Sequence, residues 1–358
     1  MDSAVARRAG QLALLAALAA GYAVAAQEPP QEPPQEPLRV AEPARLAARG
    51  LLIAIATAGE RLVAVGDRGI IVLSDDHGST WSQAAYVPAQ SLLTGVCFLD
   101  ARHGIAVGHD ELILTTEDAG NHWQRAHYAP RAQRPLLDVW CGTDAAAIAV
   151  GAYSAYFASA DGGASWREMK FAPAPAPPSR ARAGGTDAEK PEQGAAGGYH
   201  LNRIVGDGTR RLYIAAEAGH LYASDDAGVS WRTLTSPYEG SFFGVLPLAD
   251  RVLLAFGLRG HLYRSADAGV SWQPIETATV AMLTGATALD ARRIAIVGFA
   301  GVVLVSRDGG RSFALQQQAD RSGLSAAVAV GDDRLAVVGE GGARLITLEP
   351  AARGSAAP

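Results

Sequence analysis

Cysteine is scarce in this sequence, with two residues in 358, which excludes a disulfide-stapled scaffold. Basic blocks are absent as well: 31 Lys and Arg stand against 36 Asp and Glu, a net charge of −5. An acidic surface without a basic block repels phosphate backbones, so nucleic acid is excluded as a partner. The chain also lacks a phosphate-binding Gly-Lys-Ser/Thr loop and a Gly-x-Ser-x-Gly elbow, so nothing supports nucleotide hydrolysis or serine-hydrolase chemistry.

Long hydrophobic runs are missing except near the N-terminus. There Arg7 and Arg8 precede an apolar run from Ala9 to Ala20, and the small residues Ala23-Val24-Ala25 follow it. The run is shorter than the ~20 apolar residues that span a bilayer, and its flanks are typical of a signal peptide. We predict that residues 1–25 are cleaved after export across the inner membrane to the periplasm, or to the thylakoid lumen of a photosynthetic host. A retained anchor is the alternative.

A repeat dominates the rest of the chain. An Asp that is followed by Gly two residues later and by an aromatic residue five later occurs six times, at intervals of 41 to 43 residues with one interval of 65. A period near 40 residues predicts a propeller or a solenoid. The repeated pairs are Asp76 and Trp81, Asp118 and Trp123, Asp161 and Trp166, Asp226 and Trp231, Asp267 and Trp272, and Asp308 and Phe313.

The long interval contains a Pro-, Ala- and Gly-rich segment, residues 171–198, which we interpret as a flexible insertion between the third and fourth units. A Gly or Ala stands ten residues before each Asp, and Gly339 continues this series into a seventh, incomplete unit. Residues 26–37, rich in Pro, Gln and Glu, are predicted to be a linker, and residues 351–358 a disordered tail.

Each unit contains four short apolar or β-branched runs bounded by Gly, Asp or Ser, which predicts four strands per unit. The expected fold is all-β: a seven-bladed propeller over residues 38–350, with the repeated Asp and Gly in a tight turn between third and fourth strands. Because the last unit lacks an outer strand, residues 38–42 are expected to complete it. The repeated Asp and Trp residues are interpreted as structural.

The two cysteines, Cys97 and Cys141, fall in the first strands of neighbouring units, one position out of register. Inner strands of adjacent blades diverge, so we expect two separate buried thiols, with one disulfide as the alternative. No metal or cofactor is expected. His220 and His261 occupy equivalent positions 41 residues apart, and copying of the repeat explains this better than metal ligation.

The pattern Ser/Thr-x-Asp-x-Gly-x-Ser/Thr-Trp resembles the Asp-box, or bacterial neuraminidase repeat. With Val-Gly ten residues upstream, as in Val65-Gly66 before Asp76, the arrangement over residues 38–348 is similar to the photosystem II stability/assembly factor family. That resemblance implies a non-catalytic lumenal or periplasmic propeller that holds a membrane protein or an assembly intermediate. It also implies an arginine patch, for which Arg68 and Arg259 have the matching Gly-x-Arg-Gly setting.

Two other functions stay open. Asp-box proteins include glycoside hydrolases and glycan-binding proteins, although this chain lacks the Arg-Ile-Pro that sialidases share. A paired-carboxylate hydrolase needs two acids on one face, whereas the repeated acids here belong to turns. An accessory subunit of an envelope exporter is the other alternative. The propeller is expected to be a monomer.

Strand alternation predicts two different faces of the disc. The repeated turns share one face with the first-to-second-strand turns, and the opposite face carries the second-to-third-strand turns and the connections between blades. Arginine interleaved with aromatic residues is typical of protein-binding surfaces, with solvated surface arginine as the alternative. The predicted partner-binding residues of this second face are Arg68, Arg131, Arg134, Tyr238, Arg259 and Arg321, with Tyr86, Tyr128 and Phe299 between them.

Overall fold

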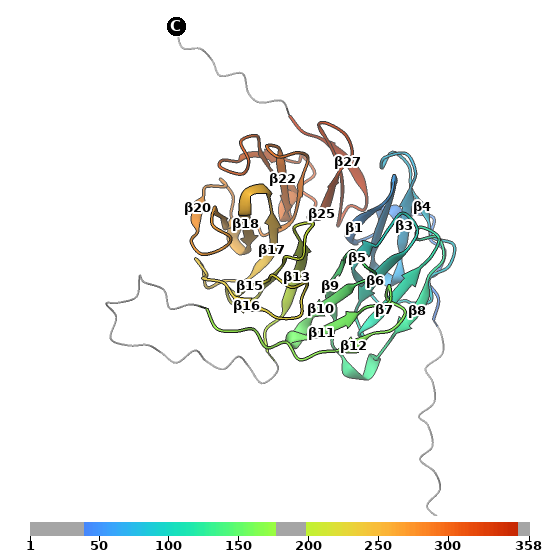
Figure 1. Cartoon of the computed structure of the whole chain (residues 1–358). Coiled ribbons are helices and arrows are strands. Elements are labelled where there is room, and N and C mark those ends of the chain that lie inside the picture. The colour runs from blue at the N-terminus through green and yellow to red at the C-terminus, as the bar shows by residue number, and fades with distance from the viewer. Residues whose placement is uncertain (1–38, 177–197, 350–358) are drawn as a thin grey trace, which may run out of the picture. The chain divides into compact units, whose positions relative to one another are not determined.

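The computed structural model describes residues 39–176 and 198–349, which form seven antiparallel sheets arranged as blades around an axis (Figure 1). Six sheets have four strands and the seventh has three. The predicted signal peptide (1–25), the linker (26–37), most of the insertion and the tail (351–358) lie outside the described residues. Within the described residues, no helix is both long and apolar enough to cross a bilayer.

Every blade begins at the axis and proceeds outward in chain order. The first strands are β1 (Leu52–Ala58), β5 (Leu93–Phe98), β9 (Leu136–Cys141), β13 (Leu201–Gly206), β17 (Phe242–Pro247), β21 (Leu283–Ala288) and β25 (Leu324–Ala329). The second strands are β2 (Arg61–Gly66), β6 (Gly104–Gly108), β10 (Ala147–Gly151), β14 (Leu212–Ala216), β18 (Leu253–Gly257), β22 (Ile294–Gly298) and β26 (Arg334–Gly339).

The outer half of each blade is shorter. The third strands are β3 (Ile71–Ser74), β7 (Leu112–Thr116), β11 (Tyr156–Ser159), β15 (Leu221–Ser224), β19 (Leu262–Ser265), β23 (Val302–Ser306) and β27 (Arg344–Thr347). The fourth strands are β4 (Ser82–Gln83), β8 (Gln124–His127), β12 (Arg167–Glu168), β16 (Arg232–Thr233), β20 (Gln273–Ile275) and β24 (Ala314–Gln317).

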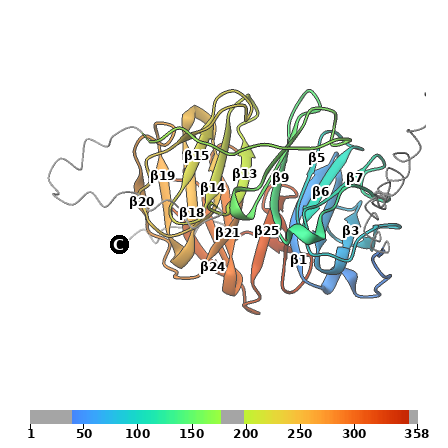
Figure 2. The same ribbon diagram turned by 90° about the horizontal axis from the view of Figure 1, so that it is seen from below.

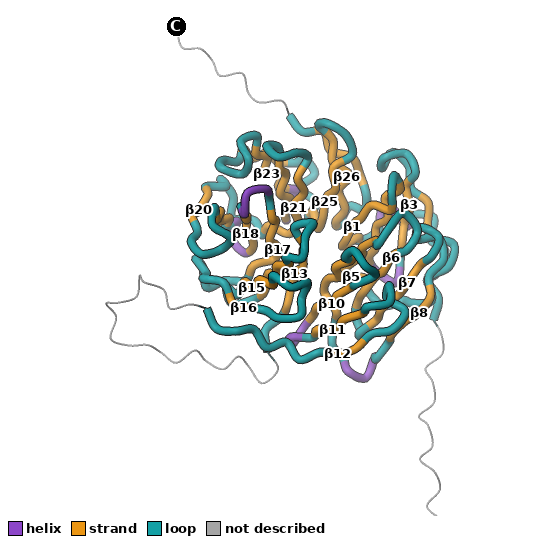
Figure 3. The backbone as a smooth tube through the Cα atoms, in the orientation of Figure 1, coloured by secondary structure: helices purple, strands orange, loops and turns teal. Residues whose placement is uncertain are grey.

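In the part of the chain that the structure describes, the helices are single 3-10 turns beside or between the strands (Figure 3). They are η1 (Ala47–Arg49), η2 (Asp67–Gly69), η3 (Pro130–Ala132), η4 (Ala152–Ser154), η6 (Ala249–Arg251), η7 (Leu258–Gly260) and η8 (Phe299–Gly301). The predicted seven-bladed, all-β fold is therefore confirmed.

The hydrophobic core is divided into seven clusters, one between each pair of neighbouring blades. Successive side chains of a strand point to opposite faces of its blade, so one strand contributes to the clusters on both sides. In β2, Val63 and Val65 pack toward blade two, whereas Leu62 and Ala64 pack toward blade seven. The cluster that contains Leu62 and Ala64 also contains Ala336 and Val338 of blade seven, so blades seven and one pack together and the ring is closed. Figure 2 shows the disc from its side.

The predicted completion of blade seven by residues 38–42 is wrong for residues 39–42, which the structure describes. The Ala41 N–H donates to Val87 O at 2.9 Å, and the Gln83 side chain donates to Glu42 O and accepts from the Ala44 N–H. The segment therefore lies against blade one. The ring closes without a shared blade: η1 inserts between the two blades, and Ala48 O accepts from the Ala343 N–H at 2.8 Å.

The glycine that precedes five of the six repeated Asp residues by ten residues permits a close approach of two backbones, and Ala216 takes this position in blade four. A Cβ atom at Gly66 would lie 2.1 Å from Leu51 O, and one at Gly257 would lie 2.2 Å from Ser241 O. The same contact recurs at Gly108, Gly151, Gly298 and Gly339. These carbonyls precede the first strands, each of which contains a β-bulge at its start.

Each repeated Asp lies in the turn between the third and fourth strands, which we call the box turn. Asp161 accepts hydrogen bonds from the Ser159 hydroxyl at 2.8 Å and from the Ser165 N–H and hydroxyl at 2.9 and 2.5 Å. The Ser165 bonds lower the pKa of Asp161 to about 2. The Trp166 indole donates to Gly163 O at 2.9 Å, so the aromatic residue closes the turn.

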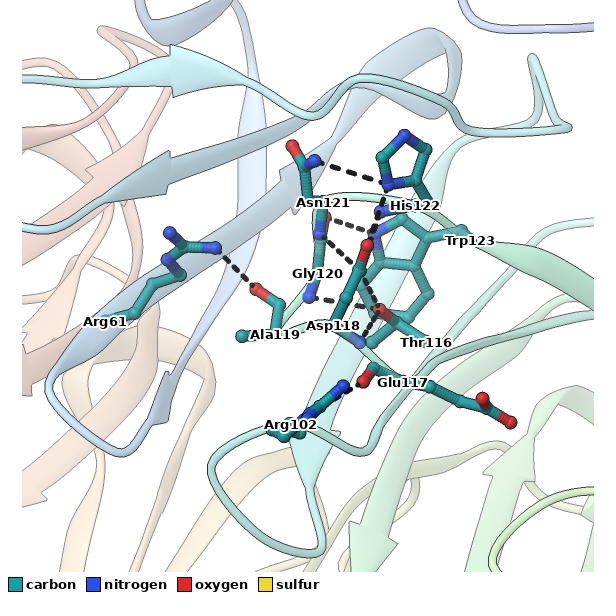
Figure 4. A network of polar contacts seen from close by, with 10 residues as sticks. All are labelled: Arg61, Arg102, Thr116, Glu117, Asp118, Ala119, Gly120, Asn121, His122 and Trp123. Carbon is teal, nitrogen blue, oxygen red and sulfur yellow. Dashed lines mark hydrogen bonds and ion pairs between the residues drawn. The ribbon is translucent and has the colours of Figure 1, made fainter.

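Blade two has the one box turn in which a histidine replaces the usual Ser or Thr (Figure 4). His122 Nδ1 lies 2.7 Å from Asp118 Oδ2, the place where a hydroxyl donates in the other box turns. Trp123 is fully buried and donates to Gly120 O at 2.7 Å. Arg61 of blade one donates to Ala119 O, so the turn is also tied to the preceding blade.

A candidate binding surface opposite the box turns

The disc has two faces built from different sets of turns, as strand alternation predicts. On the box face, Arg61 in the first-to-second turn of blade one pairs with Asp75 in the box turn at 2.6 Å. On the opposite, box-free face, the Gly69 N–H in a second-to-third turn donates to Ser91 O in the connection to blade two at 3.0 Å. The predicted binding residues in second-to-third turns, and those in blade connections other than Tyr86, therefore belong to the box-free face.

Arg68 and Arg259 are equivalent residues at the tips of η2 and η7 on this face. Their backbones are left-handed, with φ of 52° and 56°, and each is followed by a glycine with positive φ. The left-handed tip directs the side chain away from the blade: 84% of the Arg68 side chain is exposed, and its contact with Asp67 is long, at 3.7 Å. Arg259 is exposed and has no ion pair within the described residues.

Arg131 and Arg321 are also exposed on blade connections, and neither has an ion pair within the residues that the structure describes. Arg134 is different. Its Nε lies 2.5 Å from Glu111 Oε1 and its Nη2 lies 2.9 Å from Glu168 Oε1. Burial lowers the pKa of Arg134, but its hydrogen bonds to the two glutamates outweigh burial and raise the pKa. Arg134 therefore joins blades two and three.

The predicted aromatic residues also differ in how exposed they are and in what they contact. Tyr238 is half-buried, and its ring lies 4.3 Å from the ring of His261. Tyr128 lies under the Arg125 guanidinium, 4.3 Å from ring centroid to Cζ. Phe299 is 43% exposed. The Tyr86 carbonyl accepts from the backbone N–H of Trp123 in the box turn of blade two at 2.9 Å, so placing Tyr86 on the box-free face was wrong.

Blades three to five carry a patch of aromatic and histidine side chains that sequence reasoning did not assemble. In blade four the rings of Tyr199 and His220 stack at 4.0 Å, and Tyr238 and His261 repeat that pair in blade five. Tyr153, left-handed with φ of 54° and 53% exposed, meets His200 edge-on at 5.1 Å. The equivalence of His220 and His261 was visible in the sequence, but their tyrosine partners come from blade connections.

The inner strands offer no pair of carboxylates. In the seven described first strands the one acid is Asp138, whose Oδ2 accepts from the Ile204 N–H at 3.0 Å and lies 3.5 Å from Arg203 Nε. Burial raises the pKa of Asp138 against the attraction of Arg203. Glycosidic-bond hydrolysis by the usual route uses two acids that flank the bond. Among the described residues, no group of three His, Cys, Asp or Glu could hold a metal ion.

The expectation of two separate thiols was wrong. Cys97 and Cys141 form a disulfide between the inner strands of blades two and three, with their Cα atoms 5.7 Å apart. Strand divergence was the reason for expecting free thiols. The one-position offset places Cys141 one residue beyond the level of Cys97, near the first-to-second turns, where the strand ends still approach within bonding reach.

No family model matches this chain, and no curated protein is similar to it. Solved structures are similar in fold. YCF48 bound to D1 peptide is 15% identical with a TM-score of 0.65, over 85% of this chain and 95% of that one. YCF48 from Cyanidioschyzon merolae is 16% identical with a TM-score of 0.65, over 84% and 96%. The GH74 enzyme of Niastella koreensis is 14% identical with a TM-score of 0.59, over 83% of this chain and 52% of that one. At such identities the likeness is one of fold.

Proposed function

We propose that this protein is a non-catalytic periplasmic or lumenal scaffold, which binds a membrane protein or an assembly intermediate through its box-free face. The observation that carries the proposal is the projection of Arg68 and Arg259 from left-handed tips, on the same face as the aromatic patch of blades three to five. Arginine and tyrosine supply much of the binding energy at protein interfaces, since both combine a large contact area with hydrogen bonding.

Two further observations support it. YCF48, a propeller of the same fold, has been solved with a bound D1 peptide. The N-terminal run from Ala9 to Ala20, preceded by two arginines, supports export. Arg134 is removed from the proposed contact set, because its ion pairs with Glu111 and Glu168 already occupy it. The contact set is then Arg68, Arg131, Tyr238, Arg259 and Arg321, with the exposed Tyr153.

The test is a charge reversal with a matched control. Arg68→Glu with Arg259→Glu changes the net charge by four units on the box-free face. Arg251→Glu with Arg292→Glu makes the same change at exposed residues in first-to-second turns of the box face. A photo-crosslinker at position 153, used in the native host, should capture one defined envelope protein with the unmodified chain and with the control. The same yield from the Arg68/Arg259 variant would exclude the proposed surface.

Glycan binding is the second candidate, because the GH74 enzyme shares the fold and stacked tyrosines such as Tyr199 can also hold sugar rings. The single inner-strand acid, Asp138, argues for binding without hydrolysis. A polysaccharide array distinguishes the two candidates: saturable binding of a glycan that Tyr199→Ala and Tyr153→Ala abolish would replace the scaffold proposal. Sustained release of sugar from any polymer would contradict both.

A further inference from the structure

The box face contains a cavity of about 490 Å³ between the ends of the inner strands of blades two, three and four. Its wall is formed by Phe98 and Leu99, by the Cys97–Cys141 disulfide, and by Trp140 with Thr143 and Thr209 at the rim. This is the face opposite the proposed scaffold surface, so the site is independent of the proposed function.

The lining of this cavity carries no charged side chain. A second cavity of similar size, about 560 Å³, lies on the same face among blades four to six, and Asp207, Arg211, Asp250, Arg251 and Asp290 all line it. The turns around the Trp140 cavity also contain Asp100, Asp144 and Asp207, but these residues do not line it. Removing a charged ligand from water into an uncharged wall is costly, so the cavity selects a neutral occupant.

Trp140 is the one tryptophan outside the box turns. The other five indoles donate to Gly78 O, Gly120 O, Gly163 O, Thr235 O and the Tyr156 hydroxyl. The Trp140 Nε1 has no acceptor among the described residues, and its side chain is half-buried. An indole N–H that becomes buried usually has a hydrogen-bond acceptor. The Trp140 N–H has none in the described part of the chain, so it is free to donate to a ligand that covers it.

Two glycines make room for the indole. A Cβ atom at Gly142 would lie 2.2 Å from Trp140 Cη2, and one at Gly206 would lie 2.7 Å from Trp140 Nε1. The disulfide fixes the neighbouring strand ends beneath it. The indole is thus held in one place by the backbone on two sides, and a binding surface that is fixed in advance loses little conformational entropy on binding.

We infer that this cavity binds one neutral apolar side chain of a protein partner, with a backbone carbonyl of that partner accepting from the Trp140 indole. Phe98, Leu99, Val139 and the disulfide would contact the side chain, as apolar wall and floor. A peptide carbonyl next to an apolar side chain matches both features, one unused donor beside an uncharged hollow. A sugar ring offers hydroxyls on all sides, whereas the side chains of this lining offer only the Trp140 indole and the hydroxyls of Thr143 and Thr209 as strong hydrogen-bonding partners.

The experiment uses the full-length mature protein with ¹⁵N-labelled tryptophan, whose six indole signals report all six sites at once. The probes are N-acetyl-phenylalanine amide and N-acetyl-leucine amide, with N-acetyl-glutamate amide and cellobiose as alternatives. Trp140→Phe assigns the free indole. We expect a saturable shift of that signal alone with the two apolar amides, at millimolar concentration, and unchanged box-turn signals that report an intact fold.

Two variants sharpen the result. Gly206→Ala places a methyl group against the indole and should abolish the shift, whereas Tyr153→Ala, an exposed aromatic on the other face, should leave it unchanged. The inference is overturned if the Trp140 signal does not move, if cellobiose or the charged amide moves it as much, or if all six signals move together. If Gly206→Ala loses the five box-turn signals, that variant is misfolded and Trp140→Phe becomes the test. Trp140→Phe should weaken binding several-fold, as measured by the aromatic side-chain signals of Phe98.

Discussion

The sharpest test of the packing between blades is the substitution Trp123→Ala in the box turn of blade two. Trp123 is fully buried, and its indole fills the cluster between blades one and two beside Leu73, Val87 and Leu114. It also donates to Gly120 O at 2.7 Å (Figure 4). The substitution therefore leaves both a cavity between two blades and an unpaired carbonyl in the turn.

The expected cost follows from that burial. Truncating a fully buried Trp to Ala typically lowers the free energy of unfolding by about 3 to 5 kcal/mol. The structure describes roughly 290 residues, for which the entropy of unfolding is about 0.6 kcal/mol/K, so the melting temperature should fall by about 5 to 8 °C. Trp81 makes the same turn contact at 3.1 Å but is half-exposed. We expect Trp81→Ala to cost less than half as much.

Differential scanning calorimetry on the oxidised protein measures both variants, with circular dichroism to confirm that the sheet content is unchanged. The ranking is the decisive quantity, because the two residues share the sequence pattern and differ in burial. Equal losses for Trp123→Ala and Trp81→Ala would show that the turn hydrogen bond, and not packing between blades, sets the contribution of these residues. A loss below about 1 kcal/mol for Trp123→Ala would refute the packing argument outright.

Three further outcomes are expected. Hydrogen bonds hold the pKa of Asp76, Asp161, Asp226 and Asp308 at about 2 in the folded protein; stability should therefore be complete above the unfolded value near 4 and fall as the pH drops from about 4 to about 2, and a melting temperature unchanged over that range would contradict this. Cys97→Ser with Cys141→Ser opens a disulfide between residues 44 apart in sequence and should cost up to about 4 kcal/mol, with non-reducing mass spectrometry of the parent protein showing no free thiol. Gly257→Ala forces a Cβ against Ser241 O and should cost about 1 to 3 kcal/mol, whereas Gly50→Ala, with its nearest contact at 3.6 Å, should melt with the parent protein.

The fold could be predicted because the repeat specifies it many times over. The spacing of Asp76, Asp118 and the later copies, with Gly339 as the mark of a seventh unit, predicted the number of blades, and strand alternation predicted the two faces. Ring closure could not be predicted in the same way. The choice between blade seven and blade one for residues 39–44 depends on single contacts, such as Ala41 with Val87 and Ala44 with the Gln83 side chain. No periodic signal encodes such contacts.

The candidate surface was only partly predictable for a similar reason. Turn position placed Arg68, Arg259 and Arg134 on one face, but it could not show that Glu111 and Glu168 bind Arg134. These glutamates come from neighbouring blades, and both meet Arg134 only when blades two and three pack together. Trp140 could have been found, since it is the one Trp without an Asp five residues earlier. Its role depends on Gly142 and Gly206, which only coordinates bring together.

Differences among the blades separate what the fold requires from what it merely tolerates. The tip between second and third strands is left-handed in blades one to six, with Arg68, Asp110, Tyr153, Ala218, Arg259 and Ala300 at φ of 51° to 64°. Glycine adopts this conformation without strain, whereas other residues cost about 1 kcal/mol there. Gly would therefore serve the fold better at every one of these tips. Asp110, Ala218 and Ala300 occupy the same tips, so the fold tolerates non-glycine residues there without requiring a particular side chain, and the proposed function assigns Arg68, Tyr153 and Arg259 to binding.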